Sequence, residues 1–156
     1  MNVSVKKNYF ITIEGIEGVG KTTSAAYVES LLQDAGIHFV RTREPGGTEI
    51  AEKIRELLLM HHQEHMHIDT ELLLFFAGRA QHVHQKIKPA LDKGDWVLCD
   101  RFTDASFAYQ CGGRGIPEQR IEQLERWVLG DFRPDITILL HARYHLPLRL
   151  LPGIKL

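Results

Sequence analysis

The sequence predicts an α/β protein with a mostly parallel sheet flanked by helices. Short β-branched and apolar runs of strand length alternate along the chain with longer segments in which apolar residues recur at helical spacing. A glycine-rich turn joins the first of these runs to the first helical segment. Such alternation is typical of βαβ crossovers, which cover both faces of a parallel sheet. The length of 156 residues corresponds to one domain.

The first part of the chain carries two predicted strand–helix units. Residues 9–13 are β-branched and aromatic, which predicts a buried strand. Residues 21–35 place apolar side chains on one helical face, and Gly36 ends that helix. A second strand is expected over residues 37–41. Thr48 follows a glycine-containing loop and is expected to cap the next helix.

The rest of the chain continues the alternation. A long helix is expected over residues 69–91, followed by a third buried strand over residues 96–99. A short helix is expected over residues 103–110, and Pro117 is expected to start another. Residues 136–140 are expected to form a fourth strand.

Composition and charge narrow the class of protein. The formal net charge of -1 provides no overall field for nucleic acid or an anionic membrane, so neither partner is expected. No apolar stretch reaches the length of a membrane span, and no signal peptide is expected. Cys99 and Cys111 lack metal-ligand spacing, which fits a reducing, cytoplasmic setting. The histidines at 61, 62, 65 and 67 are interpreted as part of a solvated loop, with a metal site as the alternative.

A phosphate-binding loop is the firmest feature of the sequence. Residues 15–22 read G-I-E-G-V-G-K-T, which matches the pattern G-x-x-x-x-G-K-[ST] between a strand and a helix. Backbone N–H groups of such a loop surround phosphate oxygens, while Lys21 reaches the β- and γ-phosphates and Thr22 ligates Mg²⁺. The alternative is a glycine-rich turn with no ligand. The residues expected to bind ATP are Gly15, Ile16, Glu17, Gly18, Val19, Gly20, Lys21, Thr22 and Thr23.

A second phosphate site is predicted where the third strand ends. Asp100 and Arg101 follow that apolar strand, and ligands of parallel α/β sheets bind at the carboxyl ends of the strands. An aspartate there can hold the water shell of Mg²⁺, and an arginine can bind a phosphate with two donors. The alternative is a surface ion pair. We expect Lys21, Asp100 and Arg101 to be the catalytic residues, with Thr22 and Asp100 on the metal ion, partly through water.

Further segments follow in a fixed order and together resemble a known family. They read T-R-E-P-G-G-T at residues 42–48, E-L-L-L-F-F-A-G-R at 71–79, A-Y-Q-C-G-G-R-G at 108–115 and G-D-F-R-P-D at 130–135. With them, residues 9–140 resemble thymidylate kinase of the bacterial type. The resemblance implies a P-loop NTPase fold like that of nucleoside-monophosphate kinases, and the phosphorylation of dTMP to dTDP with ATP and Mg²⁺ in dTTP biosynthesis.

The resemblance also assigns roles to residues outside the phosphate loop. It implies that Phe75 stacks on thymine, that Arg79 bonds the edge of the base and that Arg101 binds the dTMP phosphate. Glu17 would lie near the sugar 3′-hydroxyl, and Tyr109 would crowd the 2′ position and disfavour a ribonucleotide. For Phe75 the alternative is packing in the core.

Three further residues complete the expected acceptor site, and one position departs from the family. Arg43 and Pro45 belong to the loop that would line the site, and Ser106 would contact the base. Ala105 stands where the family often has a hydroxyl residue. The loss of one hydrogen bond there would weaken binding by about 0.5–1.5 kcal/mol.

The end of the sequence also departs from the family. Residues 141–156 contain two prolines and no acidic residue, and they do not resemble the family's lid and last strand. We interpret this tail as the result of a truncation or frameshift, which leaves four strands and no lid. Because Gly18 stands where another subgroup has arginine, the bacterial type depends on lid arginines. A non-catalytic or unstable nucleotide-binding fragment is therefore one alternative, and a kinase for another small acceptor is a second. The resemblance also implies a homodimer.

Overall fold

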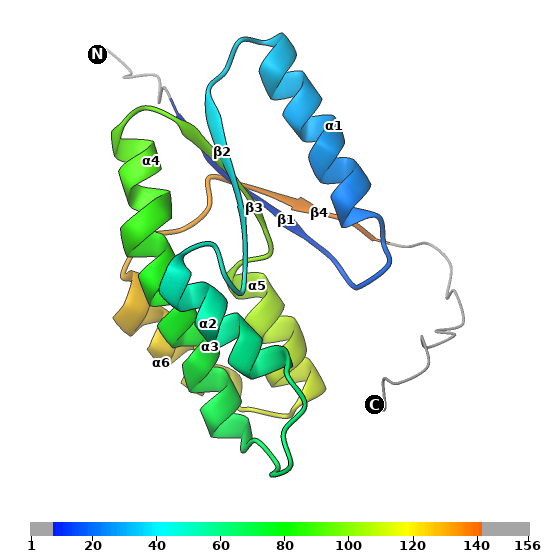
Figure 1. Cartoon of the computed structure of the whole chain (residues 1–156), viewed down its shortest axis with the longest axis vertical. Helices are drawn as coiled ribbons and strands as arrows, with labels where there is room; N and C mark the ends of the chain where they lie inside the picture. The colour runs from blue at the N-terminus through cyan, green and yellow to red at the C-terminus, as the bar shows by residue number, and fades with distance from the viewer. Residues whose placement is uncertain (1–7, 142–156) are drawn as a thin grey trace.

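A computed structural model describes residues 8–141, which form a four-stranded parallel sheet with helices on both faces (Figure 1). The strands lie in the order β2-β3-β1-β4, and each neighbouring pair is parallel. Their bounds are β1 Phe10–Glu14, β2 Phe39–Arg43, β3 Trp96–Asp100 and β4 Ile136–Leu139. This confirms the predicted fold class. The atypical tail lies outside the described residues from residue 142 onward.

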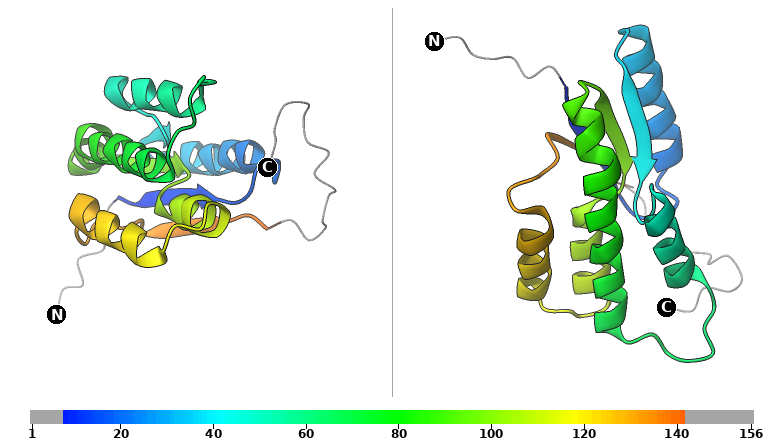
Figure 2. Two further views of the ribbon diagram at one scale, coloured as in Figure 1. Left: turned by 90° about the horizontal axis from the view of Figure 1, so that it is seen from below. Right: turned by 60° about the vertical axis from the view of Figure 1, so that its left-hand side comes forward.

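The helices connect the strands in the predicted alternation. Three consecutive segments, α3, η1 and α4, continue one another as a single long helix with a π-helical turn inside it (Figure 2). The helical segments are α1 Lys21–Asp34, α2 Glu49–Leu59, α3 Ile68–His82, η1 Val83–Ile87, α4 Lys88–Asp92, α5 Thr103–Ser106, η2 Phe107–Gly113 and α6 Glu118–Leu129.

The alternation of side chains along β1 gives the sheet two apolar faces. Ile11 and Ile13 point to the face covered by α1, where they pack with Ala25. Phe10 points to the other face and packs with residues of η1, α4 and α6. There its ring lies 5.0 Å from that of Phe102 and 5.4 Å from that of Phe132, centroid to centroid. Burial of both faces explains why β1 carries apolar side chains on both of its sides.

Several predicted boundaries were wrong. The second strand covers Phe39–Arg43 instead of residues 37–41, because Phe39 pairs with Trp96 and Arg43 pairs with Asp100. The helix expected to end at residue 110 continues through a π-helical segment to Gly113. Helical spacing alone does not locate such a segment, because its hydrogen bonds reach one residue further along the chain.

The start of α2 agrees with the sequence. Thr48 is its N-cap, and the Thr48 hydroxyl accepts a hydrogen bond from the Ala51 N–H at 3.4 Å. The apolar residues of this helix are only partly covered, since Ile50 and Leu57 are exposed. Among residues 8–141, no helix combines the length and apolar character needed to cross a bilayer.

We predict that Phe10→Ala lowers the free energy of unfolding by about 3–5 kcal/mol, because it removes the ring that Phe102 and Phe132 contact. Tyr27→Ala is the control, since Tyr27 on α1 is 65% exposed and its loss should change stability by less than about 0.5 kcal/mol. Urea denaturation of both variants measures the difference. Equal losses would contradict the assigned core.

Candidate active site

The phosphate-binding loop connects β1 to α1 and has the backbone that its glycines predict. Gly15, Gly18 and Gly20 all have positive φ angles, of 145°, 76° and 92°. At Gly15 a side chain is also excluded by space, since a Cβ there would lie 2.7 Å from the Leu140 carbonyl oxygen. The loop therefore turns tightly against β4 and delivers the chain to the N-terminus of α1, where backbone N–H groups favour anions.

Lys21 is held against the loop that precedes it. Its ammonium group donates to the carbonyl oxygens of Gly15 at 2.9 Å and Ile16 at 2.7 Å. Burial lowers the pKa of Lys21 below its usual value, and the positive charge of nearby Arg101 lowers it further. Because the positive charges of Lys21 and Arg101 repel each other, an anion bound between them would be stabilised by both.

Arg101 follows β3 in a conformation that directs it toward the loop. Its φ angle is 70°, and its N–H donates to the Ile13 carbonyl at 3.0 Å. The guanidinium lies 4.9 Å from the centre of the Tyr109 ring and 3.8 Å from a Glu17 carboxylate oxygen. The alternative of a simple surface ion pair does not describe this residue, because its side chain is only 20% exposed and has partners on two separate segments.

Asp100 lies at the end of β3, between the ends of β1 and β2, paired with Ile13 and Arg43. Its Oδ1 atom is buried and has no hydrogen-bond partner among the described residues. Its negative charge raises the pKa of Lys21, against the lowering effects of burial and of Arg101. A carboxylate oxygen is the ligand type that Mg²⁺ prefers, and Asp100 therefore fits a metal-binding role. Thr22 follows Lys21, the first residue of α1, and is exposed.

A cavity of about 670 Å³ lies beside this pair of phosphate sites. Seven of the eight residues expected to bind the acceptor line it, namely Glu17, Pro45, Phe75, Arg79, Arg101, Ser106 and Tyr109. Its remaining lining comes mainly from α2, α5 and η2. The structure thus brings together residues that are separated by up to 92 positions in the sequence.

Arg43 does not line this cavity. Its guanidinium donates to a Glu52 carboxylate oxygen at 2.8 Å, and its side chain is about half exposed. It lines a second cavity of about 510 Å³ together with Asp100. Arg43 is the last residue of β2, where successive side chains point to opposite faces, and its neighbour Glu44 faces the larger cavity instead.

Arg79 is buried at the cavity wall with most of its donors satisfied. Its Nε donates to Glu44 at 2.7 Å, and one terminal nitrogen, Nη2, donates to the Phe102 carbonyl and the Ser106 hydroxyl, both at 3.1 Å. The other terminal nitrogen, Nη1, has no hydrogen-bond partner among the described residues. A buried donor of this kind is costly unless a partner is supplied, which makes it a candidate contact for a ligand.

Of the two neighbouring phenylalanines of α3, one lines the cavity and the other packs in the core. Phe76 is 2% exposed and packs with Leu72, Ile116 and Ile121, so core packing describes this residue. Phe75 is half-buried and lines the cavity. The flat apolar face expected for a base is therefore available from Phe75 at the cavity wall.

Several polar residues of the cavity were not assigned from the sequence. Gln110 and Arg114 both donate to Glu71, at 3.2 and 3.0 Å, and Arg55 donates to the Pro45 carbonyl at 2.9 Å. Gln110 and Arg114 stood within the A-Y-Q-C-G-G-R-G segment, so a signal for them was present. Arg55 gave none, because it lies within α2 and outside all of the segments that carry the family resemblance.

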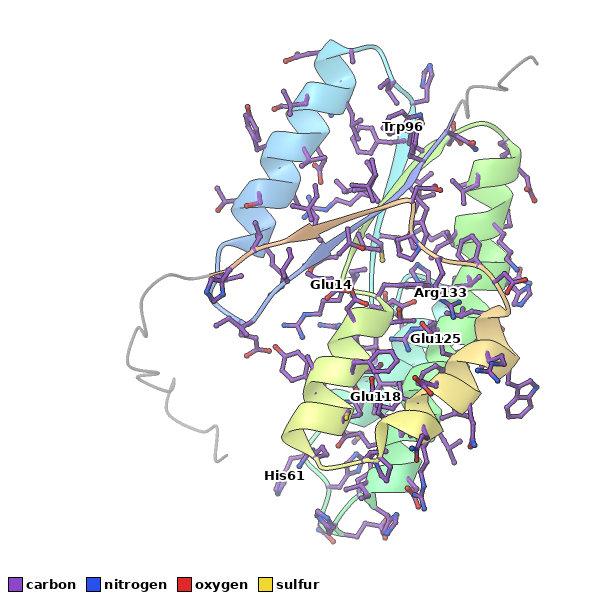
Figure 3. The ribbon with its side chains drawn as sticks, turned by 180° about the vertical axis from the view of Figure 1, so that it is seen from behind. Glu14, His61, Trp96, Glu118, Glu125 and Arg133 are labelled. Carbon is purple, nitrogen blue, oxygen red and sulfur yellow. The ribbon has the colours of Figure 1, made fainter. Side chains whose placement is uncertain are left out.

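Glu14 is a further buried acid that the sequence did not single out. It ends β1, is 4% exposed and accepts a hydrogen bond from the Phe102 N–H at 2.6 Å (Figure 3). Burial raises its pKa to about 7, against the lowering effect of the Phe102 N–H. The negative charge of Asp104 raises the pKa further, and Arg101 and Arg79 lower it.

The histidine-rich loop is built differently from a metal site. His67 is the N-cap of α3, where its Nδ1 accepts from the Asp69 N–H at 3.2 Å. The His62 ring bonds the Leu57 carbonyl at 2.7 Å, and His61 and His65 are exposed. Within the described part of the chain, no group of three or more His, Cys, Asp or Glu residues is arranged to hold a metal ion.

Comparison with known proteins decides the family. A family model described as "Thymidylate kinase" matches residues 13–149, beyond residue 140 where we placed the end of the resemblance. The chain belongs to the thymidylate kinase family. It is 57% identical over 136 residues to the thymidylate kinase of Ruthia magnifica, and 59% identical over 130 residues to that of Ectopseudomonas mendocina.

The alignments cover a larger share of this chain than of either relative. The alignments include 87% and 83% of this chain, but only 66% and 62% of the two relatives. The fold is similar to the crystal structure of thymidylate kinase from Ehrlichia chaffeensis, with a TM-score of 0.79 and 42% identity. That match covers 86% of this chain and 77% of the other. The thymidylate kinase resemblance predicted from the sequence is confirmed.

We predict that Glu14→Gln removes one component of the pH dependence of stability. Between about pH 4.5 and 7 the folded wild type binds a proton at Glu14 that the unfolded chain releases, so its stability falls as the pH rises. Glutamine cannot ionise and can still accept the Phe102 N–H. The variant should therefore gain up to about 3 kcal/mol relative to wild type between pH 5 and 8.

Urea denaturation of both proteins at pH 5, 6, 7 and 8 measures this difference. Other titrating groups are common to the two proteins and cancel in the comparison. Parallel stability profiles across this range would show that Glu14 is ionised in the folded protein throughout.

Proposed function

We propose that this chain carries the site at which a thymidylate kinase transfers the γ-phosphoryl group of ATP to dTMP, giving dTDP for dTTP synthesis. One observation carries the proposal: the cavity that holds Phe75 and Arg79 adjoins the phosphate loop through Arg101 and Glu17. An acceptor in that cavity would have its phosphate beside Lys21. Family membership supports the same reaction.

The base end of the cavity suits a pyrimidine. Phe75 offers a ring face, and the Arg79 Nη1 donor is buried without a partner among the described residues. Ser106 already accepts from Arg79 and is fixed at the same wall. A thymine carbonyl would satisfy the remaining Arg79 donor, and this hydrogen bond would be stronger than usual because the donor is charged.

The phosphate end concentrates positive charge where two anionic groups must meet. Lys21 would contact the donor phosphates and Arg101 the acceptor phosphate, which reduces the repulsion between them. When bound, Mg²⁺ would neutralise charge on the transferring phosphates, and Thr22 and Asp100 are the residues that would hold it. Arg43 is left out of the acceptor site, because its guanidinium is paired with Glu52.

The sugar would lie between Glu17 and Tyr109. The Glu17 carboxylate is highly exposed and its oxygen lies 3.8 Å from Arg101, so a 3′-hydroxyl near the acceptor phosphate could reach it. The Tyr109 ring packs over the Arg101 guanidinium and closes the adjoining wall. A nucleotide bound in this position would have its 2′ carbon beside the ring, which would crowd a 2′-hydroxyl.

We propose a cytoplasmic homodimer as the working form. Leu73 on α3 and Trp127 on α6 are 54% and 81% exposed, and the two helices contact each other, so they provide an apolar surface for a second copy. Both cysteines are free, which fits a reducing compartment. Light scattering of the purified chain measures the assembly, and a monomer at micromolar concentration would contradict it.

We predict that Lys21→Ala and Arg101→Ala each reduce dTMP phosphorylation by about 10³-fold or more, since each removes a cation from the phosphates. The measurement is a coupled assay with ATP, Mg²⁺ and dTMP. Lys53→Ala and Arg120→Ala are matched controls, because these exposed residues pair with Glu49 and Asp69 and do not line the cavity.

The same assay separates the proposal from a purely nucleotide-binding role. Saturable dTMP binding by calorimetry without turnover would favour a non-catalytic fragment. Full activity of the Lys21→Ala, Arg101→Ala double variant would refute the assigned phosphate sites.

We predict that Tyr109→Ala reduces the preference for dTMP over ribothymidine monophosphate by about tenfold, because it removes the ring from the sugar wall. Tyr109→Phe keeps the ring over Arg101 and should retain most of the preference. Competition between the two nucleotides gives the ratio of kcat/KM values directly. An unchanged ratio in Tyr109→Ala would place the discrimination elsewhere.

A further inference from the structure

His82 is a fully buried polar residue that does not line the cavity. It ends α3, one helical turn beyond Arg79, and its exposed fraction is 0%. Both ring nitrogens have partners: Nδ1 lies 3.0 Å from a Glu44 carboxylate oxygen, and Nε2 lies 2.6 Å from the Thr42 hydroxyl. A histidine buried only for its volume would not need two polar partners.

Glu44 connects His82 to Arg79. Its Oε1 atom accepts from His82 and its Oε2 atom accepts from the Arg79 Nε at 2.7 Å. The Glu44 side chain is only 5% exposed, so water does not replace either donor. Because each carboxylate oxygen has its own partner, rotation of the carboxylate would break both contacts at once. Within residues 8–141, loss of His82 would leave Arg79 as the only donor to this carboxylate.

The partners of His82 assign the proton on one of its ring nitrogens. The Glu44 carboxylate can only accept, so Nδ1 of His82 carries the proton. Nε2 shares a hydrogen bond with the Thr42 hydroxyl, which can both donate and accept. Thr42, His82, Glu44 and Arg79 thus form a connected network of hydrogen bonds that ends at the cavity wall.

The backbone around His82 leaves the ring no room to turn. A Cβ atom on Gly47 would lie 2.5 Å from both Cδ2 and Nε2 of His82 and 2.6 Å from the Thr42 hydroxyl. The E-P-G-G loop therefore packs its backbone directly on the ring. Thr42 is fixed in turn, because it lies in β2 and pairs with Cys99 of β3.

We infer that His82 is a positioning residue for nucleotide recognition, which acts through Glu44 to orient the Arg79 guanidinium toward a pyrimidine base in the cavity. This inference rests on the proposed function, in which the unpartnered Arg79 Nη1 contacts thymine. Thr42 acts less directly, because it fixes the His82 ring, which in turn fixes the Glu44 carboxylate. A purely structural His82 would instead affect folding and leave base recognition unchanged in every variant that folds.

Three substitutions separate these roles. In His82→Asn the side-chain amide nitrogen takes the place of Nδ1, so the donor to Glu44 is kept. In His82→Gln the amide reaches toward Thr42, but no donor remains at the Nδ1 position. Thr42→Val removes the hydroxyl and keeps the side-chain shape. Melting temperatures identify the variants that fold, and Thr42→Val provides a test even where a change at His82 prevents folding.

The first measurement follows Arg79 itself. The Arg79 Nε–Hε resonance in ¹⁵N-labelled full-length chain, assigned by its absence in Arg79→Lys, reports the hydrogen bond to Glu44 without any nucleotide. We expect this resonance to shift strongly in His82→Gln, less in Thr42→Val and least in His82→Asn. An unchanged resonance in folded His82→Gln would overturn the inference. This result does not depend on whether the chain binds dTMP.

The second measurement is affinity. We expect dTMP binding, by calorimetry, to weaken about tenfold in His82→Gln, as for the loss of one charge-assisted hydrogen bond, and by less than about threefold in His82→Asn. ATP affinity should stay constant in both, and in an active chain KM for dTMP should rise more than kcat falls. Equal loss of dTMP and ATP affinity would mark a structural role and reject the inference. If wild type does not bind dTMP, the proposed function is wrong. In that case the Arg79 resonance alone tests whether His82 positions Arg79.

Discussion

The parallel pairing of β1 with β3 is the constraint on which the site depends. It places Ile13 opposite Asp100, so the two strands end together and the phosphate loop lies beside the turn that carries Arg101. Two hydrogen bonds then fix that turn: the Arg101 N–H donates to the Ile13 carbonyl, and the Phe102 N–H donates to Glu14. Sheet register therefore brings the phosphate loop with Lys21 close to Arg101, the two cations proposed to bind the donor and acceptor phosphates.

The cavity proposed for the acceptor depends in turn on buried polar groups at the edge of the apolar core. The charge of Arg79 is almost completely buried. It is tolerated there because Glu44, Ser106 and the Phe102 carbonyl accept hydrogen bonds from the guanidinium. His82 completes the partners of Glu44. The π-helical segment η2 supplies the opposite wall, where Tyr109, Gln110 and Arg114 line or border the same space.

The sequence predicted features well where they depend on residues close together in the chain. It predicted them poorly where they depend on contacts that only folding creates. The phosphate loop, the cap at Thr48 and the order of strands were all recognisable, whereas Arg43 was placed with the acceptor site and is paired with Glu52. Helical spacing did not decide between Phe75 and its neighbour, because both lie near the boundary between cavity and core. Family resemblance made that choice, and the structure places Phe75 at the cavity.

The sequence by itself determined the fold class, the phosphate loop and the family, because these follow from backbone propensity and from residue types at short spacing. Only the tertiary structure decided which buried groups support the site. Glu44 meets Arg79 across 35 positions, and Glu14 meets the Phe102 N–H across 88. Such contacts leave no periodic trace in a single sequence, since they depend on how strands and helices from separate segments pack around one buried charge.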